Sequence, residues 1–171
     1  VEAKAATIAA AKYDGPVYMR FGRLAVPVIF DRDYTFEWGK AQVLTEGSDV
    51  AILATGLMVN EALMAAEQLK NDGISARVIN VHTIKPLDEE CVINAARECG
   101  CVVTAEEHNV IGGLGAAVAQ AVCQGCPVPV LSVGTQDVFG RSGKVPPLLE
   151  MYGLTPANIA ENAKKAIALK K

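Results

Sequence analysis

The chain has 171 residues, a formal net charge of −3 and 51% hydrophobic residues, which fits one compact domain with a small addition. A chain of this length buries roughly 70% of its unfolded surface, so folding requires neither disulfides nor a metal ion. The weak negative charge, and the absence of an apolar run near the roughly 20 residues that cross a bilayer, give no reason to expect nucleic acid or a membrane as a partner.

The N-terminal stretch is expected to be the end of a larger unit. The first residues lack both an initiator methionine and the segments of a signal peptide, so we expect a piece of a longer protein. Residues 3–12 predict an alanine-rich helix, and residues 16–21 alternate as a strand. A helix and one strand cannot bury themselves. Residues 24–40 lack a clear period, which predicts a linker.

From about residue 42 onward, short apolar runs alternate with helical patterns. Such runs are typical of strands that helices cover on both faces, and the alternation implies right-handed crossovers between parallel strands. The sequence therefore predicts an α/β fold, a three-layer α/β/α sandwich. The expected strands are 41–44, 50–54, 77–81, 102–105 and 128–133, and the expected helices are 57–71, 89–98, 113–123 and 156–169.

Helix-end signals support these helices. Gly73 and Gly100 stand just after two of them, where a left-handed residue closes the last turn. Asp88 is expected to cap the helix 89–98, and Thr155, followed by proline, is expected to cap the last helix.

The stretch Ala105–Gly115, AEEHNVIGGLG, follows a predicted strand and opens a predicted helix. Open α/β sheets bind ligands at this edge, so one interpretation pairs Glu106 or Glu107 with His108 for acid/base chemistry beside an anion at the helix terminus. The other interpretation, which we favour, makes the glycines of this stretch the means of close helix-to-sheet packing. Their spacing matches neither nucleotide-binding glycine motif.

Four of the five cysteines form two close pairs, and an odd total without secretory features predicts a cytoplasmic protein. Four converging thiolates could hold a structural zinc ion. The surrounding patterns, a buried strand and last helical turns, instead favour cysteine as a small apolar residue, so we expect no metal site on the chain. The pairs are Cys99 with Cys101 and Cys123 with Cys126.

Two further residues stand just beyond predicted strands. His82 follows the strand 77–81 and is expected to form hydrogen bonds at a surface or interface. Arg23 follows the strand 16–21, where its planar guanidinium could bind a phosphate through two parallel bonds, although alone it would more commonly form a surface salt bridge. The residues by themselves thus describe an α/β fragment without a complete catalytic set.

Several segments together resemble transketolase, in this order and with this spacing. They span nearly the whole chain and are especially similar to the short bacterial and archaeal transketolases that are split into two polypeptides, of which the second carries the pyrimidine-binding and C-terminal domains. The segments are GPVYMRFGR, RVINVHTIKPLDEE, VVTAEEHNVIGGLGAAVAQ, VGTQDVFGRSG and MYGLTPANI.

The resemblance implies the C-terminal part of an enzyme that moves a two-carbon ketol unit between sugar phosphates, as in the pentose phosphate pathway. The implied cofactors are thiamine diphosphate and a divalent metal, Mg²⁺ or Ca²⁺. Residues 1–36 would be a remnant of the pyrimidine-binding domain plus linker. Residues 37–171 would be a transketolase C-terminal domain, with a mixed, mostly parallel five-stranded sheet whose first strand is antiparallel.

The resemblance also implies where the chemistry lies. Cofactor ligands are expected upstream of Val1, so this chain alone should hold no catalytic residue, bind no cofactor and be inactive. Arg23 matches the family's arginine that binds the substrate phosphate, and Arg20 is a weaker second candidate. For AEEHNVIGGLG the family supplies no chemical step, which places His108 in the fold or at a subunit boundary. The implied partners are the rest of transketolase, a second copy in a dimer or other homo-oligomer, and sugar phosphates.

Two alternatives remain at this stage. The first is another thiamine-diphosphate enzyme, 1-deoxyxylulose-5-phosphate synthase or the β subunit of a 2-oxoacid dehydrogenase, which share the HTIKPLD-like segment. The second is a stand-alone anion-binding or assembly module that uses the carboxyl edge of the sheet.

Overall fold

The computed structural model describes residues 1–23 and 25–170, and the chain divides into two compact units. Val1–Trp38 form the N-terminal unit, and Gly39–Lys171 form the C-terminal unit. Among the described residues, no helix is long and apolar enough to cross a membrane.

The N-terminal unit contains one helix, α1 (Glu2–Lys12), where the alanine-rich pattern predicts it, and α1 buries none of its residues. In the described part of residues 13–38 no further helix or strand forms, so the strand predicted at residues 16–21 is wrong. The alternation itself persists, with Val17 half-buried and Tyr18 exposed. A strand also requires a hydrogen-bonded neighbour, however, and the described residues of this unit form none.

In the C-terminal unit, five strands of the described residues form one sheet in the order β1-β3-β2-β4-β5. The pairs β2–β3, β2–β4 and β4–β5 are parallel, whereas β1 runs antiparallel to β3 with an irregularity after its second residue. The mixed, mostly parallel sheet that was expected is confirmed. The strands are β1 (Gln42–Thr45), β2 (Val50–Ala54), β3 (Ala76–Asn80), β4 (Val102–Asn109) and β5 (Val130–Thr135).

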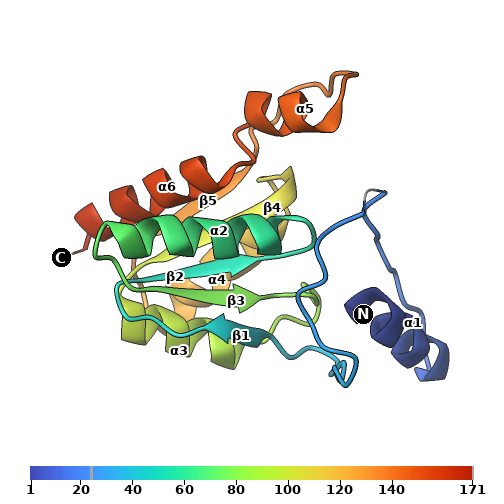
Figure 1. The fold of residues 1–171 in the computed structure, drawn as a ribbon. Coiled ribbons are helices and arrows are strands. Elements are labelled where there is room, and N and C mark those ends of the chain that lie inside the picture. Colours follow the sequence, from blue (N-terminus) through green and yellow to red (C-terminus); the bar gives the residue numbers. More distant parts are fainter. Residues whose placement is uncertain (24, 171) are drawn as a thin grey trace. The chain divides into compact units, whose positions relative to one another are not determined.

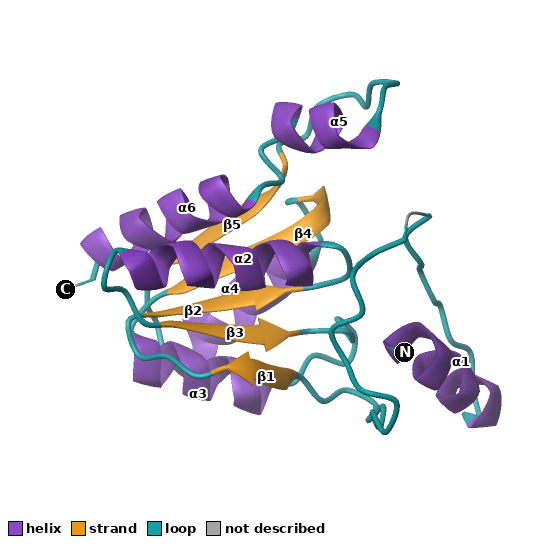
Figure 2. Cartoon of the chain, in the orientation of Figure 1, coloured by secondary structure: helices purple, strands orange, loops and turns teal. Residues whose placement is uncertain are grey.

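Helices cover both faces of this sheet, as Figure 1 and Figure 2 show. α2 (Met58–Asn71) and α6 (Pro156–Ala168) pack together on one face, and α3 (Glu89–Cys99) and α4 (Leu114–Gly125) pack together on the other. Each of these four helices turns one apolar stripe toward the sheet, as a 3.6-residue period requires. The three-layer α/β/α sandwich predicted from the sequence is therefore confirmed.

The core lies on both sides of the central strand β2, in which all five residues have no exposed surface. On the α3/α4 face, Leu53 and Ile79 from the strands pack in one cluster with Val92 and Val118 from the helices. A strand buried on both faces needs an unbroken apolar run, and VAILA supplies it.

The predicted helix ends are confirmed. The carboxylate of Asp88 accepts a hydrogen bond of 3.2 Å from the N–H of Cys91. The hydroxyl of Thr155 caps α6 through a 3.3 Å bond. Gly73 and Gly100 adopt left-handed φ angles of 76° and 70° after α2 and α3.

Two features of the C-terminal unit differ from the sequence prediction. β4 continues past Ala105 to Asn109, so the polar residues 106–109 belong to the strand instead of following it. A short helix that the sequence analysis missed, α5 (Val145–Met151), lies between β5 and α6. Pro146 and Pro147 occupy its first turn, where a missing N–H removes no helical hydrogen bond.

Candidate functional site

The edge at which open α/β sheets bind ligands is well defined here. β2 lies between β3 and β4, so the chain order reverses at β2, and ligands of such sheets lie outside the carboxyl ends of the strands at this point. The turn after β2 begins at Thr55, whose N–H donates a 3.1 Å hydrogen bond to the carbonyl of Ala105 in β4. The stretch Ala105–Gly115 therefore lies at the switch point of the sheet.

Glu106 occupies the position that an anion would take. Its side chain is 1% exposed, and its two carboxylate oxygens accept hydrogen bonds of 2.7 Å each from the N–H groups of Leu114 and Gly115. These N–H groups open α4, where the unpaired donors and the helix dipole favour negative charge. The chain thus fills this helix terminus with its own carboxylate, which leaves no room there for a phosphate group.

The glycines of this stretch explain how Glu106 reaches the helix. A Cβ atom on Gly113 would overlap the Glu106 carboxylate, and one on Gly115 would lie 2.5 Å from the hydroxyl oxygen of Ser132 in β5. Gly112 has a φ of 78°, a left-handed conformation that side chains disfavour. These contacts support the close-packing interpretation of the glycines.

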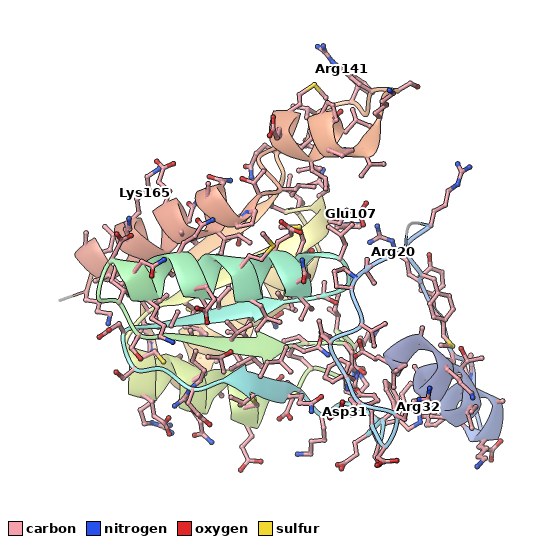
Figure 3. The ribbon with its side chains drawn as sticks, viewed as in Figure 1. Arg20, Asp31, Arg32, Glu107, Arg141 and Lys165 are labelled. Carbon is pink, nitrogen blue, oxygen red and sulfur yellow. The ribbon has the colours of Figure 1, made fainter. Side chains whose placement is uncertain are left out.

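Glu106 is not available for an acid/base pair with His108, because its carboxylate is buried against α4. Glu107 and His108 are both exposed at the end of β4, where the register of the strand is irregular. His108 is exposed, and its Nδ1 lies 3.0 Å from the carbonyl oxygen of its neighbour Asn109, which can only accept a hydrogen bond. Figure 3 shows Glu107 at the end of β4.

Asn109 is a connecting residue that the sequence analysis missed. Its amide donates a 2.8 Å hydrogen bond to the carboxylate of Asp137, and its side-chain oxygen accepts one of 2.8 Å from the N–H of Ile111. Asp137 has a positive φ of 52°, which is uncommon for a residue other than glycine. This hydrogen bond joins the end of β4 to the segment after β5. The two residues are 28 positions apart, and no local sequence pattern predicts such a contact.

The cysteines do not converge. All five are free, and among the described residues no group of three or more His, Cys, Asp or Glu side chains could hold a metal ion. The buried thiols of Cys99 and Cys101 lie 3.5 Å from the carbonyl oxygens of Gly47 and Asp49, and burial raises the pKa of both thiols. They pack as small apolar residues in their protonated form.

The remaining candidates belong to different units of the chain. His82, half-buried after β3, has its Nδ1 2.7 Å from the hydroxyl oxygen of Thr83. Arg23 and Arg20 are exposed in the N-terminal unit, on the extended stretch beyond α1, and Figure 3 labels Arg20. The two arginines are three residues apart in the chain. An exposed guanidinium can bind a phosphate by donating hydrogen bonds to its oxygens.

These features define a doubly wound α/β domain in which the Glu106 carboxylate occupies the start of α4, where an anion could otherwise bind. The comparisons then identify the family. The family model described as "Transketolase, C-terminal domain" matches residues 39–159, and the chain belongs to this family.

Similar proteins support that assignment. The chain is 51% identical over 151 residues to the 6-deoxy-6-sulfo-D-fructose transketolase subunit SqwH of Clostridium sp. (strain MSTE9), covering 88% of this chain and 47% of that protein. It is 47% identical over 154 residues to a putative transketolase C-terminal section of Methanocaldococcus jannaschii, covering 88% and 48%. The chain therefore spans about half the length of these relatives.

Solved structures agree on the fold. A structure described as "Split gene transketolase, inactive beta4 tetramer" matches with a TM-score of 0.96 and 48% identity, covering 98% of this chain and 55% of that chain. A transketolase of Pichia stipitis matches with a TM-score of 0.57 at 22% identity, over 76% of this chain, and shows the shared fold.

Proposed function

We propose that this chain is the C-terminal part of a split, thiamine-diphosphate-dependent transketolase that moves a two-carbon ketol unit between sugar phosphates. In this proposal it works in the cytoplasm, in pentose phosphate interconversion, and in a homo-oligomer with its partner subunit. The observation that carries the proposal is the match to the split-gene transketolase, because 98% coverage at 48% identity includes residues of both units.

The described residues do not fit the cofactor itself. Thiamine diphosphate needs a pyrophosphate site with a divalent metal, and the described residues contain no cluster of metal ligands. Glu106 already occupies the helix terminus at which a diphosphate could bind. We therefore assign thiamine diphosphate and its metal, Mg²⁺ or Ca²⁺, to the rest of the enzyme, and we expect this chain alone to be inactive.

Arg23 is the residue that we propose for substrate binding. Its side chain is exposed, and a planar guanidinium binds the oxygens of a phosphate through two parallel hydrogen bonds. The same geometry suits a sulfonate, which also presents three oxygens around one centre. This point is relevant because one relative is named for a sulfonated sugar and another, 40% identical over 152 residues, for apulose 4-phosphate.

The primary test reconstitutes the enzyme. The full-length subunit is mixed with its cofactor-binding partner, thiamine diphosphate and Mg²⁺, and ketol transfer is measured with xylulose 5-phosphate, apulose 4-phosphate and 6-deoxy-6-sulfofructose as donors. We expect transfer from at least one donor and none from either subunit alone. No transfer from any donor, despite assembly confirmed by size-exclusion chromatography, would refute the proposed activity.

A substitution tests the role of Arg23. In the reconstituted enzyme, Arg23→Ala should raise the KM for anionic donors about 10- to 100-fold, because a hydrogen bond to a charged group contributes about 1.5–3 kcal/mol. The KM for an uncharged ketose should stay the same. Arg32→Ala, which removes another exposed arginine of the same unit, is the matched control and should leave both KM values unchanged. An unchanged KM in Arg23→Ala would remove the assignment.

The second candidate function is 1-deoxyxylulose-5-phosphate synthase. A synthase of Heliobacterium modesticaldum is 40% identical over 159 residues, and covers 91% of this chain, but the chain spans only 25% of that protein. Product analysis separates the two functions, because the synthase consumes pyruvate and releases carbon dioxide. Carbon dioxide release from pyruvate without ketol transfer would favour the synthase, or the β subunit of a 2-oxoacid dehydrogenase.

A further inference from the structure

The segment between β5 and α6 projects from the C-terminal unit. We call residues 136–153 the α5 arm; Figure 1 shows α5 standing beyond the end of β5, apart from the helix layers. The arm exposes large apolar side chains, with Phe139 99% exposed, Val138 58% and Met151 48%. α5 itself has no buried residue. The arm therefore contributes little to the core of its own unit.

Hydrogen bonds nevertheless hold the arm in one conformation. At its root, Asp137 accepts the 2.8 Å bond from Asn109. The hydroxyl of Tyr152 donates a 3.1 Å bond to the carbonyl of Phe139, which ties the loop to the helix. At the far end, the amide of Asn158 in α6 donates a 2.7 Å bond to the carbonyl of Gly153. A fully exposed phenylalanine on a loop whose backbone is hydrogen-bonded fits an interface anchor, because less backbone freedom is lost when the loop is buried.

The charges of the arm are balanced. Asp137 and Glu150 are acidic, and Arg141 and Lys144 are basic, so the two signs cancel. Arg141 extends outward near the tip, as Figure 3 shows. In a two-fold symmetric contact the same patch faces itself, so a surface with both signs can pair its charges across the axis. A patch of one sign would instead repel its copy.

We propose that the α5 arm is a contact surface between two copies of this chain, with Phe139 as its apolar anchor. The proposal rests on the proposed function, in which the chain is a subunit of an oligomer. One observation favours a second copy as the occupant: the structural relative that covers 98% of this chain is described as an inactive beta4 tetramer. The arm carries two charges of each sign, so it would not repel a copy of itself.

The test measures self-association of the full-length subunit by sedimentation velocity over a range of concentrations. Phe139→Glu should weaken self-association roughly 30-fold or more, as the loss of a central aromatic anchor does at other interfaces. Met64→Glu is the matched control, because Met64 is an apolar side chain of α2 that is 50% exposed, and it should not change the assembly. Both variants should keep the secondary structure of the wild type by circular dichroism, since neither site lies in the core.

A charge variant gives an independent measurement. Arg141→Glu combined with Lys144→Glu leaves the arm with four acidic residues and no basic one. Two such arms repel, so self-association should fall at low salt and recover partly as salt screens the repulsion. A general folding defect would not recover with salt.

Three results would overturn the proposal. They are a wild-type subunit that stays monomeric at all concentrations, a Phe139→Glu subunit that assembles like the wild type, and a Phe139→Glu subunit that self-associates normally but no longer binds the cofactor-binding subunit. The last result would place the arm against the other subunit. Ketol transfer by the reconstituted wild type is a separate readout, so the proposed function can stand if the arm proposal fails.

Discussion

The two units of this chain differ in what stabilises them, although both contain alanine-rich helices. α6 places Ile159, Ala160, Ala163 and Ala166 on one buried stripe against the sheet. α1 has alanines all around and buries none of its residues. Alanine thus lets a helix form in both places, but only a stripe that meets a sheet adds tertiary stability.

The contrast extends beyond the helices. In the described part of residues 1–38 no residue is fully buried, and aromatic contacts such as Tyr13–Trp38, with ring centroids 5.1 Å apart, supply the packing. In the C-terminal unit a complete strand, Val50–Ala54, has no exposed surface. The C-terminal unit therefore contains a buried core that stabilises its fold, whereas the described residues of the N-terminal unit form no such core. Four predictions test this contrast, from the largest expected effect to the smallest.

The largest effect is expected at Glu106. Replacing Glu106 with Ala leaves two buried N–H donors without an acceptor and opens a cavity, so it should lower the free energy of unfolding by about 4 kcal/mol. Urea denaturation measures the loss. Glu67→Ala, at an exposed position of α2, is the control and should change stability by no more than about 0.5 kcal/mol. A loss below about 1 kcal/mol at Glu106 would contradict the structural role.

The second prediction compares the units directly. Leu53→Ala removes a side chain with no exposed surface and should lower the free energy of unfolding by about 3 kcal/mol. Tyr18→Ala removes a larger side chain that is 93% exposed and should change it by no more than about 0.5 kcal/mol. The same urea titration measures both variants. Equal losses would show that the N-terminal unit is packed as tightly as the sheet.

The third prediction concerns alkaline pH. Burial raises the pKa of the Cys99 and Cys101 thiols, so the folded state favours the neutral thiol, whereas the unfolded chain ionises above about pH 8.5. The contribution of these thiols to the free energy of unfolding should be constant below that pH. It should decrease as the pH rises further, by at most about 1.4 kcal/mol per pH unit for each thiol. Denaturation in reducing buffer between about pH 7.5 and 10 measures the slope. Cys101→Ala should flatten it, and the exposed Cys123→Ala should not.

The smallest effect is expected from truncation. A chain that starts at Gly39 keeps every strand of the sheet and all four helices that cover it. Its thermal midpoint should match that of residues 1–171 within a few degrees, because the core lies within this unit. Differential scanning calorimetry measures both. A large drop would show that the N-terminal unit stabilises the sheet, and would remove the contrast between the units.

The C-terminal unit was largely predictable because its signals are local. The apolar run VAILA marks a strand buried on both faces, and Asp88 marks a helix start. The strand predicted at residues 16–21 failed because strand formation depends on a neighbour that local alternation does not reveal. α5 was not predicted because proline is found both in turns and in the first turn of a helix, so Pro146 and Pro147 do not by themselves indicate a helix.

The sequence by itself determined the five strands and the four covering helices of the C-terminal unit, the caps and the resemblance to transketolase, since these follow from residue periods, end signals and motif spacing. The tertiary structure decided the role of AEEHNVIGGLG. A carboxylate before a glycine-rich turn fits both a ligand site and a packed helix terminus. Its role depends on whether solvent or the N–H groups eight and nine residues later surround it. In this chain those N–H groups donate hydrogen bonds to Glu106. Its carboxylate is buried, and a buried carboxylate requires such partners, so Glu106 has a structural role.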